Sequence, residues 1–362
     1  MKYENWMAGI TEISGRKKIK LESYMGSAKE VYDLNERQLE RTGILTKREE
    51  MIFLEHQKNR NLQLEEEICS KEQIQLINYG RINYPSRLLP LYNPPYGIYY
   101  KGRLPEETKP SIAVVGARRC SSYGSKIAEQ IGYRLGLLGI TVVSGMAEGI
   151  DGQGHQGTLK AGGATYGVLG CGIDVCYPVK NRTIYEEIPK KGGLLSEYPP
   201  GTKPLPIHFP ARNRLISGLA DFVIVVEARK KSGSLITADF ALEQGKDVFA
   251  VPGRISDALS GGTNELIQQG AGIFLGIENV LSQWSAFTDT SYEFTVKTEN
   301  ALEKLERLVY SCLDLTPRNL EELMKKTELT LPQLIQGITG LREKAFISEV
   351  YKNYFIRSNA DV

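Results

Sequence analysis

Seven short apolar runs, most of them separated by helical patterns, constrain the fold of this chain more than any other feature. They are rich in β-branched residues and do not alternate with polar residues, which is typical of strands buried on both faces of a sheet. The runs are SIAVV (111–115), ITVV (140–143), ATYGVLG (164–170), GLLSE (193–197), DFVIVVE (221–227), DVFAV (247–251) and GIFLG (272–276). The helical patterns cover 123–138, 151–162, 181–190, 234–244 and 263–270. Repeated strand–helix units predict an α/β fold, an open parallel sheet with helices on both faces.

Ligands of such sheets bind beyond the carboxyl ends of the strands. The first run is followed by the loop GARRCSSYG, residues 116–124. A strand, a glycine-bounded loop and a helix start outline a phosphate cradle, because backbone N–H groups and helix N-termini attract anions. Arg118 and Arg119 add positive charge, and Ser121 or Ser122 can cap the helix. Neither G-x-G-x-x-G nor G-K-[ST] is present, so the loop is not a dinucleotide fingerprint or a Walker loop. A plain turn with solvated arginines is the alternative.

The second run ends in SGMAEGIDGQGH. Ser144 and Gly145 allow the backbone to approach a ligand closely. We expect Asp151 to be the N-cap of the next helix and His155 to make a supporting hydrogen bond. A catalytic role for this Asp and His is the alternative.

The fourth run leads into the proline-rich segment SEYPPGTKPLPIHFPARNRLISGLA. We expect Arg212, Asn213 and Arg214 to begin a helix there. Arginines at a helix start oppose the helix dipole, which indicates that an anion or a nearby carboxylate compensates them. Phe209 stands beside this basic cluster, where it either stacks on unpaired bases or packs in the core.

The fifth run is followed by ARKKSGSLITADFAL. Ser232, Gly233, Ser234 and Thr237 are expected at a helix N-terminus, which makes a second anion site beside the first. Two anion sites at one sheet edge suit a polyphosphate or a nucleic-acid backbone better than a single phosphate.

Composition divides the chain of 362 residues into five parts. Residues 1–80 show helical periodicity, 81–110 are rich in proline and aromatic residues and read as a surface connector, and 111–285 hold the α/β domain. Residues 286–300 read as a polar linker. Residues 301–357 return to helical patterning and finish in an alternating segment typical of a hairpin or wing.

The bulk composition excludes several classes of protein. The net charge is only +2, so a nucleic-acid site has to be a local patch. The five cysteines form no C-x-x-C pair, which argues against a disulfide framework and a zinc site. No apolar run approaches eighteen residues, and the N-terminal stretch has no long apolar run. We therefore expect a cytoplasmic protein with no membrane contact, no metal and no cofactor.

The central motifs together resemble those of the DprA/Smf family of bacterial DNA-processing proteins. The matching segments, in the family's order, are VVGARRCSSYG, SGMAEGIDGQGH, GVLGCGIDVCYP, SEYPPGT, FPARNRLISGLAD, VVEARKKSGSLITADFAL, VFAVPG and GGTNELIQQGA. The resemblance implies a Rossmann-like fold that binds single-stranded DNA, forms a homodimer, and delivers the strand to the RecA recombinase during natural transformation. The N-terminal part resembles the family's SAM-like or helix-hairpin-helix-like module, and 301–357 resemble its winged-helix module.

The resemblance also assigns roles to particular residues. Gly116, Ala117 and Arg118 match the family's G-[SA]-R phosphate pocket, and Phe209, Arg212 and Asn213 match its F-x-x-R-N segment. Where some members carry a lysine just before that segment, Lys203 is the nearest substitute here. Residues 263–275 correspond to the family's dimerisation region. Its members expected at the interface are Leu266, Ile267, Gln268 and Phe274.

Two other functions compete with DNA binding. The related nucleotide phosphoribohydrolases, enzymes of the lysine-decarboxylase-like group, need a glutamate three residues after a helix-start threonine. Here Thr237 is followed by Ala238, Asp239 and Phe240, so that carboxylate is missing. We therefore expect a protein that is not an enzyme. A recombination scaffold that touches DNA only weakly is the other alternative.

Overall fold

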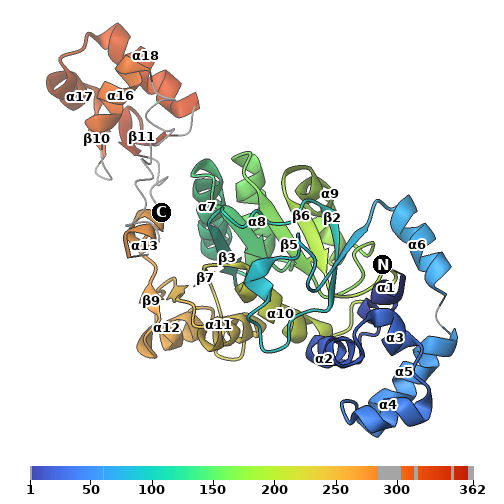
Figure 1. Cartoon of the computed structure of the whole chain (residues 1–362). Helices are drawn as coiled ribbons and strands as arrows, with labels where there is room; N and C mark the ends of the chain where they lie inside the picture. The colour runs from blue at the N-terminus through green and yellow to red at the C-terminus, as the bar shows by residue number, and fades with distance from the viewer. Residues whose placement is uncertain (1, 60, 284–302, 314–316, 344–345, 358–362) are drawn as a thin grey trace. The chain divides into compact units, whose positions relative to one another are not determined.

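The computed structural model describes residues 2–59, 61–283, 303–313, 317–343 and 346–357. The expected linker, 286–300, lies outside them. The chain divides into two units, Met1–Ile273 and Phe274–Val362, and each is described by itself (Figure 1). Within the described ranges, no helix has the length and apolar character needed to cross a bilayer.

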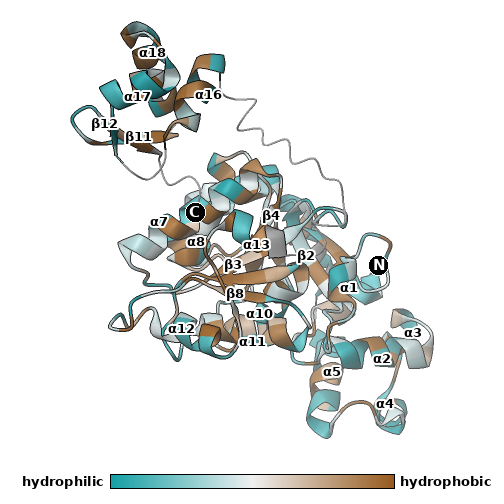
Figure 2. Cartoon of the chain, turned by 90° about the vertical axis from the view of Figure 1, so that its left-hand side faces the viewer, coloured by the Kyte–Doolittle hydropathy of each residue, from teal (hydrophilic) through white to brown (hydrophobic). Residues whose placement is uncertain are grey.

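A nine-stranded sheet forms the centre of the larger unit, in the order β1-β2-β6-β5-β4-β3-β7-β8-β9. The strands from β3 onward match the seven predicted runs and pair in parallel, so the predicted sheet is confirmed. Their bounds are β3 Ser111–Val115, β4 Thr141–Ser144, β5 Thr165–Leu169, β6 Gly193–Ser196, β7 Phe222–Val225, β8 Val248–Ala250 and β9 Gly272–Ile273. Figure 2 shows the apolar colour concentrated along these central strands.

Two antiparallel strands extend the sheet where only helices and a connector are expected. β1 (Gln75–Asn78) pairs with β2 (Gly97–Gly102), and β2 pairs antiparallel with β6. The expectation that 81–110 form a surface connector is therefore wrong for β2. Its residues Ile98 and Tyr99 are buried because they cover the sheet edge beside β6.

Helices cover both faces of the sheet (Figure 1). They are α7 Ser122–Leu137, α8 Ile150–Lys160, α9 Arg182–Lys191, α10 His208–Leu219, α11 Gly233–Glu243 and α12 Gly261–Gln268. Alternate side chains of β3 point to opposite faces of the sheet and contact different helices. Val115 packs with Ile216 of α10 and Ala238 of α11 in one core cluster. Val114 faces α8 instead. The backbone of Gly154 on α8 lies so close that a Cβ there would be 3.3 Å from the side chain of Val114.

Six helices precede the sheet, with bounds α1 Lys2–Ala8, α2 Gly15–Met25, α3 Ala28–Tyr32, α4 Glu36–Thr42, α5 Lys47–Asn59 and α6 Leu62–Lys71. A core of their own holds α1, α2 and α5 together. Trp6 meets Phe53 edge to face with ring centroids 4.9 Å apart. Lys18 is buried beneath this core and donates to the carbonyl of Ile10 at 2.9 Å, so its charge is satisfied locally.

The smaller unit begins with α13 (Ile277–Gln283) and continues with α16 Lys304–Ser311, β10 Arg318–Asn319, α17 Leu320–Thr327, α18 Leu331–Glu343, β11 Ile347–Tyr351 and β12 Tyr354–Arg357. The last three strands form an antiparallel sheet in the order β10-β12-β11. Val309, Leu323, Leu334 and Phe355 share one apolar core. This core is separate from that of the large sheet.

Candidate functional site

The chain turns in opposite directions from two neighbouring strands, β3 and β7. From β3 it proceeds through α7 to β4 on one side, and from β7 through α11 to β8 on the other. Such a topological switch point leaves a crevice at the carboxyl ends of the strands. A pocket of about 580 Å³ lies there. The loops after β3 and β7 and the helices α10 and α11 line it.

The pocket brings together most of the residues expected in the site. Those that line it are Gly116, Ala117, Arg118, Arg119, Phe209, Arg212, Asn213, Ser232, Gly233, Ser234 and Thr237. The pocket is also lined by Tyr177, Arg229 and Lys231, which were not expected in the site. Arg229 and Lys231 belong to the ARKK stretch directly after β7, and their position at a strand end was the available signal.

The N-terminus of α7 already holds an anion supplied by the protein. Ser121 is its N-cap and accepts from the N–H of Gly124 at 3.0 Å, so the predicted cap is confirmed. The carboxylate of Glu227 in turn accepts from the N–H of Ser121 at 2.8 Å and from its hydroxyl. Glu227 is 3% exposed. This helix end, expected as the first phosphate cradle, is therefore filled from inside the fold.

The N-terminus of α11 is open. Ser232 is the N-cap, and its hydroxyl accepts from the N–H of Ser234. A Cβ placed on Gly233 would meet no atom within 4 Å. Free space directly in front of a helix N-terminus is where an anion binds most favourably. Of the two helix N-termini expected as anion sites, that of α11 is therefore the open one.

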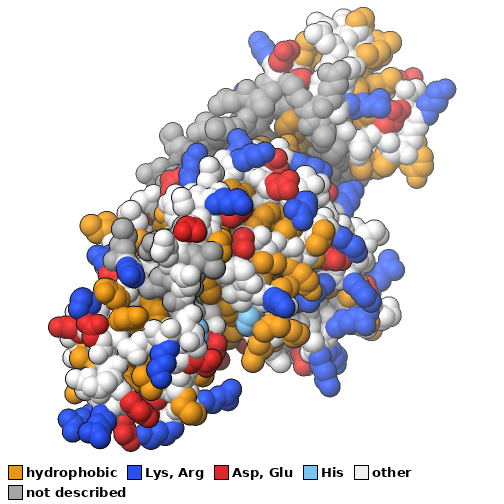
Figure 3. Space-filling model, turned by 90° about the vertical axis from the view of Figure 1, so that its right-hand side faces the viewer, with side chains coloured by type: hydrophobic (Ala, Val, Ile, Leu, Met, Phe, Trp, Pro, Cys, Tyr) orange, Lys and Arg blue, Asp and Glu red, His pale blue; other side chains and the backbone are white. Residues whose placement is uncertain are grey.

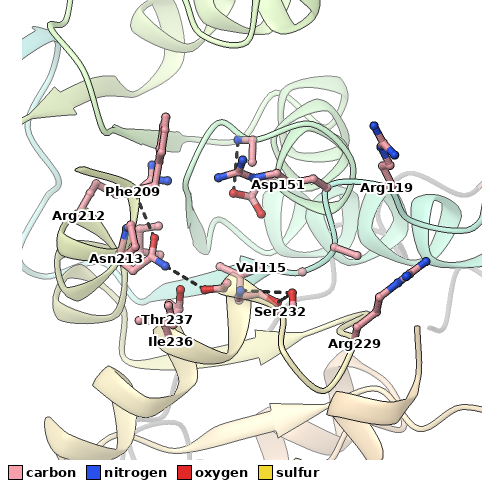
Figure 4. A pocket seen from close by; sticks show the side chains of 18 of the residues that line it. Val115, Arg119, Asp151, Phe209, Arg212, Asn213, Arg229, Ser232, Ile236 and Thr237 are labelled. Atoms are coloured by element: carbon pink, nitrogen blue, oxygen red, sulfur yellow. Dashed lines mark hydrogen bonds between the residues drawn. The ribbon is translucent and has the colours of Figure 1, made fainter. Parts of the chain in front are cut away.

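Four exposed cationic side chains line the pocket, namely Arg118, Arg119, Arg229 and Lys231. Figure 4 shows Arg119 and Arg229 on one side of the pocket, with Phe209, Arg212 and Asn213 on the opposite side. On the face of the larger unit drawn in Figure 3, basic and acidic side chains are interspersed. A local cluster therefore supplies the positive field, as the net charge of +2 requires.

Arg212 lines the pocket but is committed to the fold. Its guanidinium Nη1 donates to the carbonyl of Gly145 at 2.7 Å and to that of Val168. The side chain is 4% exposed, and burial lowers its pKa to about 10, still well above neutral. The charge therefore remains, but its donors hold the loop after β4 and the end of β5.

Asp151 is the buried counter-charge of this arginine. Its Oδ2 accepts from the N–H of Gly145 at 3.0 Å and of Ala147 at 3.4 Å. The N-cap of α8 is Gly149, so the expectation that Asp151 caps this helix is wrong. The carboxylate ties down the preceding loop instead. Burial raises its pKa, and the nearby Arg212 opposes that rise.

Asn213 links α10 to the open helix end. Its Nδ2 donates to the carbonyl of Gly233 at 3.1 Å, and its Oδ1 accepts from Nε of Arg212 at 3.2 Å (dashed lines in Figure 4). A chain of contacts thus runs from the loop after β4, through two adjacent side chains, to α11. Arg212 and Asn213 hold the pocket in shape.

The expectation that Arg212, Asn213 and Arg214 begin a helix is wrong. α10 begins at His208, four residues before Arg212, because Pro210 falls in the first turn, where a missing N–H costs nothing. Arg214 points away from the pocket lining and pairs with Glu197 at 2.6 Å. The arginines therefore do not oppose the dipole at the start of α10, and no compensating anion is required there.

Four other expected residues lie outside the pocket lining. Ser144 is buried, and its hydroxyl donates to the carbonyl of Val114. Gly145 donates its N–H to Asp151. Ser121 is engaged by Glu227. Lys203 is exposed on the segment before α10.

His155 has a structural role on the buried side of α8. The hydroxyl of Thr165 donates to the carbonyl of Val142, so it accepts from Nδ1–H of His155 at 2.7 Å. Burial lowers the pKa of this histidine to about 3, which keeps it neutral. The expected supporting hydrogen bond is confirmed.

The expected interface residues differ in their accessibility. Leu266 is 6% and Phe274 3% exposed, so both are core side chains in this structure. Ile267 is half-buried and Gln268 is exposed. Leu266 was expected to meet a partner chain, but its side chain packs into the core beneath α12.

A second cavity of about 400 Å³ lies between α11 and α12. Asp239 and Glu265 line it together with Lys230. Asp239, the carboxylate nearest in sequence to the position that the enzymatic alternative requires, thus lies outside the lining of the main pocket. Among the described residues, no cluster of three or more His, Cys, Asp or Glu side chains could hold a metal ion.

A doubly wound α/β fold, with an open helix N-terminus and four cations lining the pocket at its switch point, places the protein among α/β proteins whose site is suited to phosphate groups. Comparison of the sequence with known families narrows this assignment. The DNA recombination-mediator protein A family matches residues 75–285, which is more than half of the chain, and the chain belongs to this family. The family expected from the motifs is therefore confirmed.

Individual relatives agree with this placement. The DNA processing protein DprA of Streptococcus pneumoniae is 42% identical over 235 residues, 64% of this chain and 82% of the relative. That of Bacillus subtilis is 44% identical over 201 residues, 55% of this chain and 68% of the relative.

Two solved structures share the fold. The X-ray structure of DprA from S. pneumoniae has a TM-score of 0.68 at 36% identity and covers 78% of this chain and 98% of its own. DNA processing protein A from Helicobacter pylori, described for its unique single-stranded DNA binding mode, has a TM-score of 0.53 at 31% identity. It covers 58% of this chain and 95% of its own.

Proposed function

We propose that this protein binds single-stranded DNA through its phosphates, with one phosphate at the N-terminus of α11. The observation that carries the proposal is the open space at Gly233, in a pocket whose lining includes Arg118, Arg119, Arg229 and Lys231. Arginines hold phosphate oxygens bidentately, and the helix N-terminus adds backbone donors. The H. pylori relative, described as binding single-stranded DNA, supports this choice of ligand.

Contacts to phosphate predict binding that depends on salt and little on sequence. The test is fluorescence anisotropy with an oligonucleotide of about 20 nucleotides, longer than one such site needs, in single- and double-stranded form. Arg118→Ala should weaken all sequences alike and reduce the salt slope by about 0.7 for each lost phosphate contact. Arg37→Ala, at an exposed arginine of α4, is the control. An unchanged slope in Arg118→Ala would place the phosphate elsewhere.

The role we propose is binding without catalysis. Asp151, the carboxylate in the pocket lining, already accepts hydrogen bonds from backbone N–H groups of the loop after β4. The free carboxylates Asp239 and Glu265 belong to the second cavity. Incubation of the protein with nucleoside monophosphates should release no base, whereas release would favour the phosphoribohydrolase alternative.

We further propose that the protein forms a homodimer and delivers the bound strand to the RecA recombinase, in the cytoplasm. The strand β9 is an edge of the sheet, and Ile273 on it is 46% exposed. Of the expected interface residues on α12, Gln268 is exposed and Ile267 is half-buried. Sedimentation of wild type and Ile273→Lys tests the dimer. ATP hydrolysis by RecA on single-stranded DNA, with and without the protein, tests delivery.

The flanking modules have proposed roles as well. We assign residues 1–80 to a SAM-like module and 301–357 to a winged helix. The order of α16, β10, α17, α18 and the β11–β12 hairpin supports the second assignment. On α18, Arg342 pairs with Glu349 at 3.1 Å, which favours packing or protein contact over reading a major groove.

A further inference from the structure

Tyr177 presents an aromatic ring at the rim of the pocket. It follows β5 in the chain, lines the same pocket as Arg118 and Gly233, and is 41% exposed. Its position beside cations places a flat apolar surface next to the proposed phosphate positions.

The ring of Phe209 is already in use. The guanidinium carbon of Arg118 lies 5.2 Å from its centroid, and the ring of Tyr177 lies 5.6 Å away with 30° between the planes. Gly170 also approaches it, since a Cβ there would lie 2.8 Å from Cδ1 of Phe209. This ring separation is that of aromatic pairs in direct contact, so no base fits between them. Phe209 supports Tyr177 and Arg118, and the accessible ring is that of Tyr177.

The segment 204–207, directly before α10, is apolar. Pro204 and Pro206 line the pocket. Leu205 and Ile207, which alternate with them, are 48% and 75% exposed. Such a surface suits the faces of nucleobases, whereas Arg119 and Arg229 on the other side of the pocket suit phosphates (Figure 4).

We infer that Tyr177, held by Phe209, is the platform on which an unpaired nucleobase stacks when the strand's phosphates lie at α11. This inference rests on the proposed function. A base inside a duplex has both faces covered by its neighbours, so only a single strand can use the ring. Tyr177 would therefore set the preference for single strands, while the cations set the overall affinity. Every base has a stackable face, so the contact tolerates any sequence.

The test compares Tyr177→Ala, Tyr177→Leu and Tyr177→Phe. Tyr133→Ala is the matched control, because Tyr133 on α7 is also 41% exposed but lies outside the pocket lining. Far-UV circular dichroism checks that each variant folds. The probes are single strands that carry 2-aminopurine or an abasic site at successive positions, together with the matching duplex.

Loss of one stacked base should weaken single-strand binding roughly tenfold in Tyr177→Ala and Tyr177→Leu. Duplex binding should stay unchanged, and Tyr177→Phe should bind like wild type. One abasic position should weaken wild type but not Tyr177→Ala, and 2-aminopurine at that position should be quenched only by proteins with the ring. If Tyr177→Ala equals Tyr133→Ala and no abasic position matters while Arg118→Ala still weakens binding, the platform is overturned and the proposed function stands. If wild type binds no single strand, both fail.

Discussion

The carboxylate of Glu227, at the end of β7, accepts hydrogen bonds from both the N–H and the hydroxyl of Ser121, the N-cap of α7. The two residues are 106 positions apart, and the contact joins the loops after two neighbouring strands. It gives α7 its own permanent anion. The proposed phosphate position is therefore at the other helix end of the pocket, that of α11.

Glu227→Gln should lower the free energy of unfolding by about 1–3 kcal/mol, because a charged acceptor of two buried hydrogen bonds is lost. Urea unfolding followed by circular dichroism measures the change. Glu187→Gln is the control, since that glutamate forms an exposed pair with Lys190. Equal stability of the two variants would mean that the Glu227 contact does not hold the loop.

Gly233→Ala should separate binding from folding. The added methyl meets no atom within 4 Å, and alanine stabilises a helix by about 0.5–1 kcal/mol over glycine, so stability should hold or rise. The same methyl occupies the space in which a phosphate would approach α11, so oligonucleotide affinity should fall several-fold.

Gly261→Ala is the matched control for this substitution, because Gly261 is also the first residue of a helix and its Cβ would meet only Lys230 at ordinary contact distance. Anisotropy titrations of both variants decide the question. Wild-type affinity in Gly233→Ala would remove the phosphate from this helix end.

Arg212→Lys should lower stability without changing the salt dependence of DNA binding. Lysine cannot reproduce the planar donor set that reaches Gly145 and Val168 together, and Asp151 would lose part of its buried compensation. Thermal unfolding and the salt slope are the two measurements. An unchanged melting temperature with a smaller slope would instead show that Arg212 contacts phosphate directly.

His155 should make the fold sensitive to acid. Its pKa is about 3 in the folded chain against an ordinary value of 6.5, so between these values the unfolded chain binds a proton that the folded one does not. Stability therefore falls as the pH drops from 6.5 towards 3, by up to about 1.4 kcal/mol per pH unit. Urea unfolding at several pH values in this window should show a shallower dependence in His155→Gln than in His208→Gln. Equal slopes would contradict the prediction.

Local patterns predicted the sheet well because buried parallel strands are apolar throughout and their helices begin at recognisable caps, as Ser121 and Ser232 do. β2 escaped prediction because its aromatic residues follow a run of prolines, and its pairing with β6 depends on residues nearly a hundred positions later.

The site was predictable in outline only. Strand ends marked its loops, but no local pattern tells whether a charged side chain is free or already engaged. Glu227 meets Ser121 across 106 positions, and Arg212 reaches Gly145 across 67. The start of α10 was misplaced because Pro210 reads as a helix breaker, although the first turn accepts it.

The pocket combines a buried floor, in which Arg212, Asn213 and Asp151 are fastened to the backbone, with a rim of cations that are exposed to solvent. Mutations in the two parts have different consequences. A substitution in the floor primarily affects the stability of the fold. A substitution in the rim instead changes the electrostatic attraction to the ligand, one charge at a time. Substitutions in the rim can therefore change the ligand affinity of such a protein in small steps while its fold stays intact.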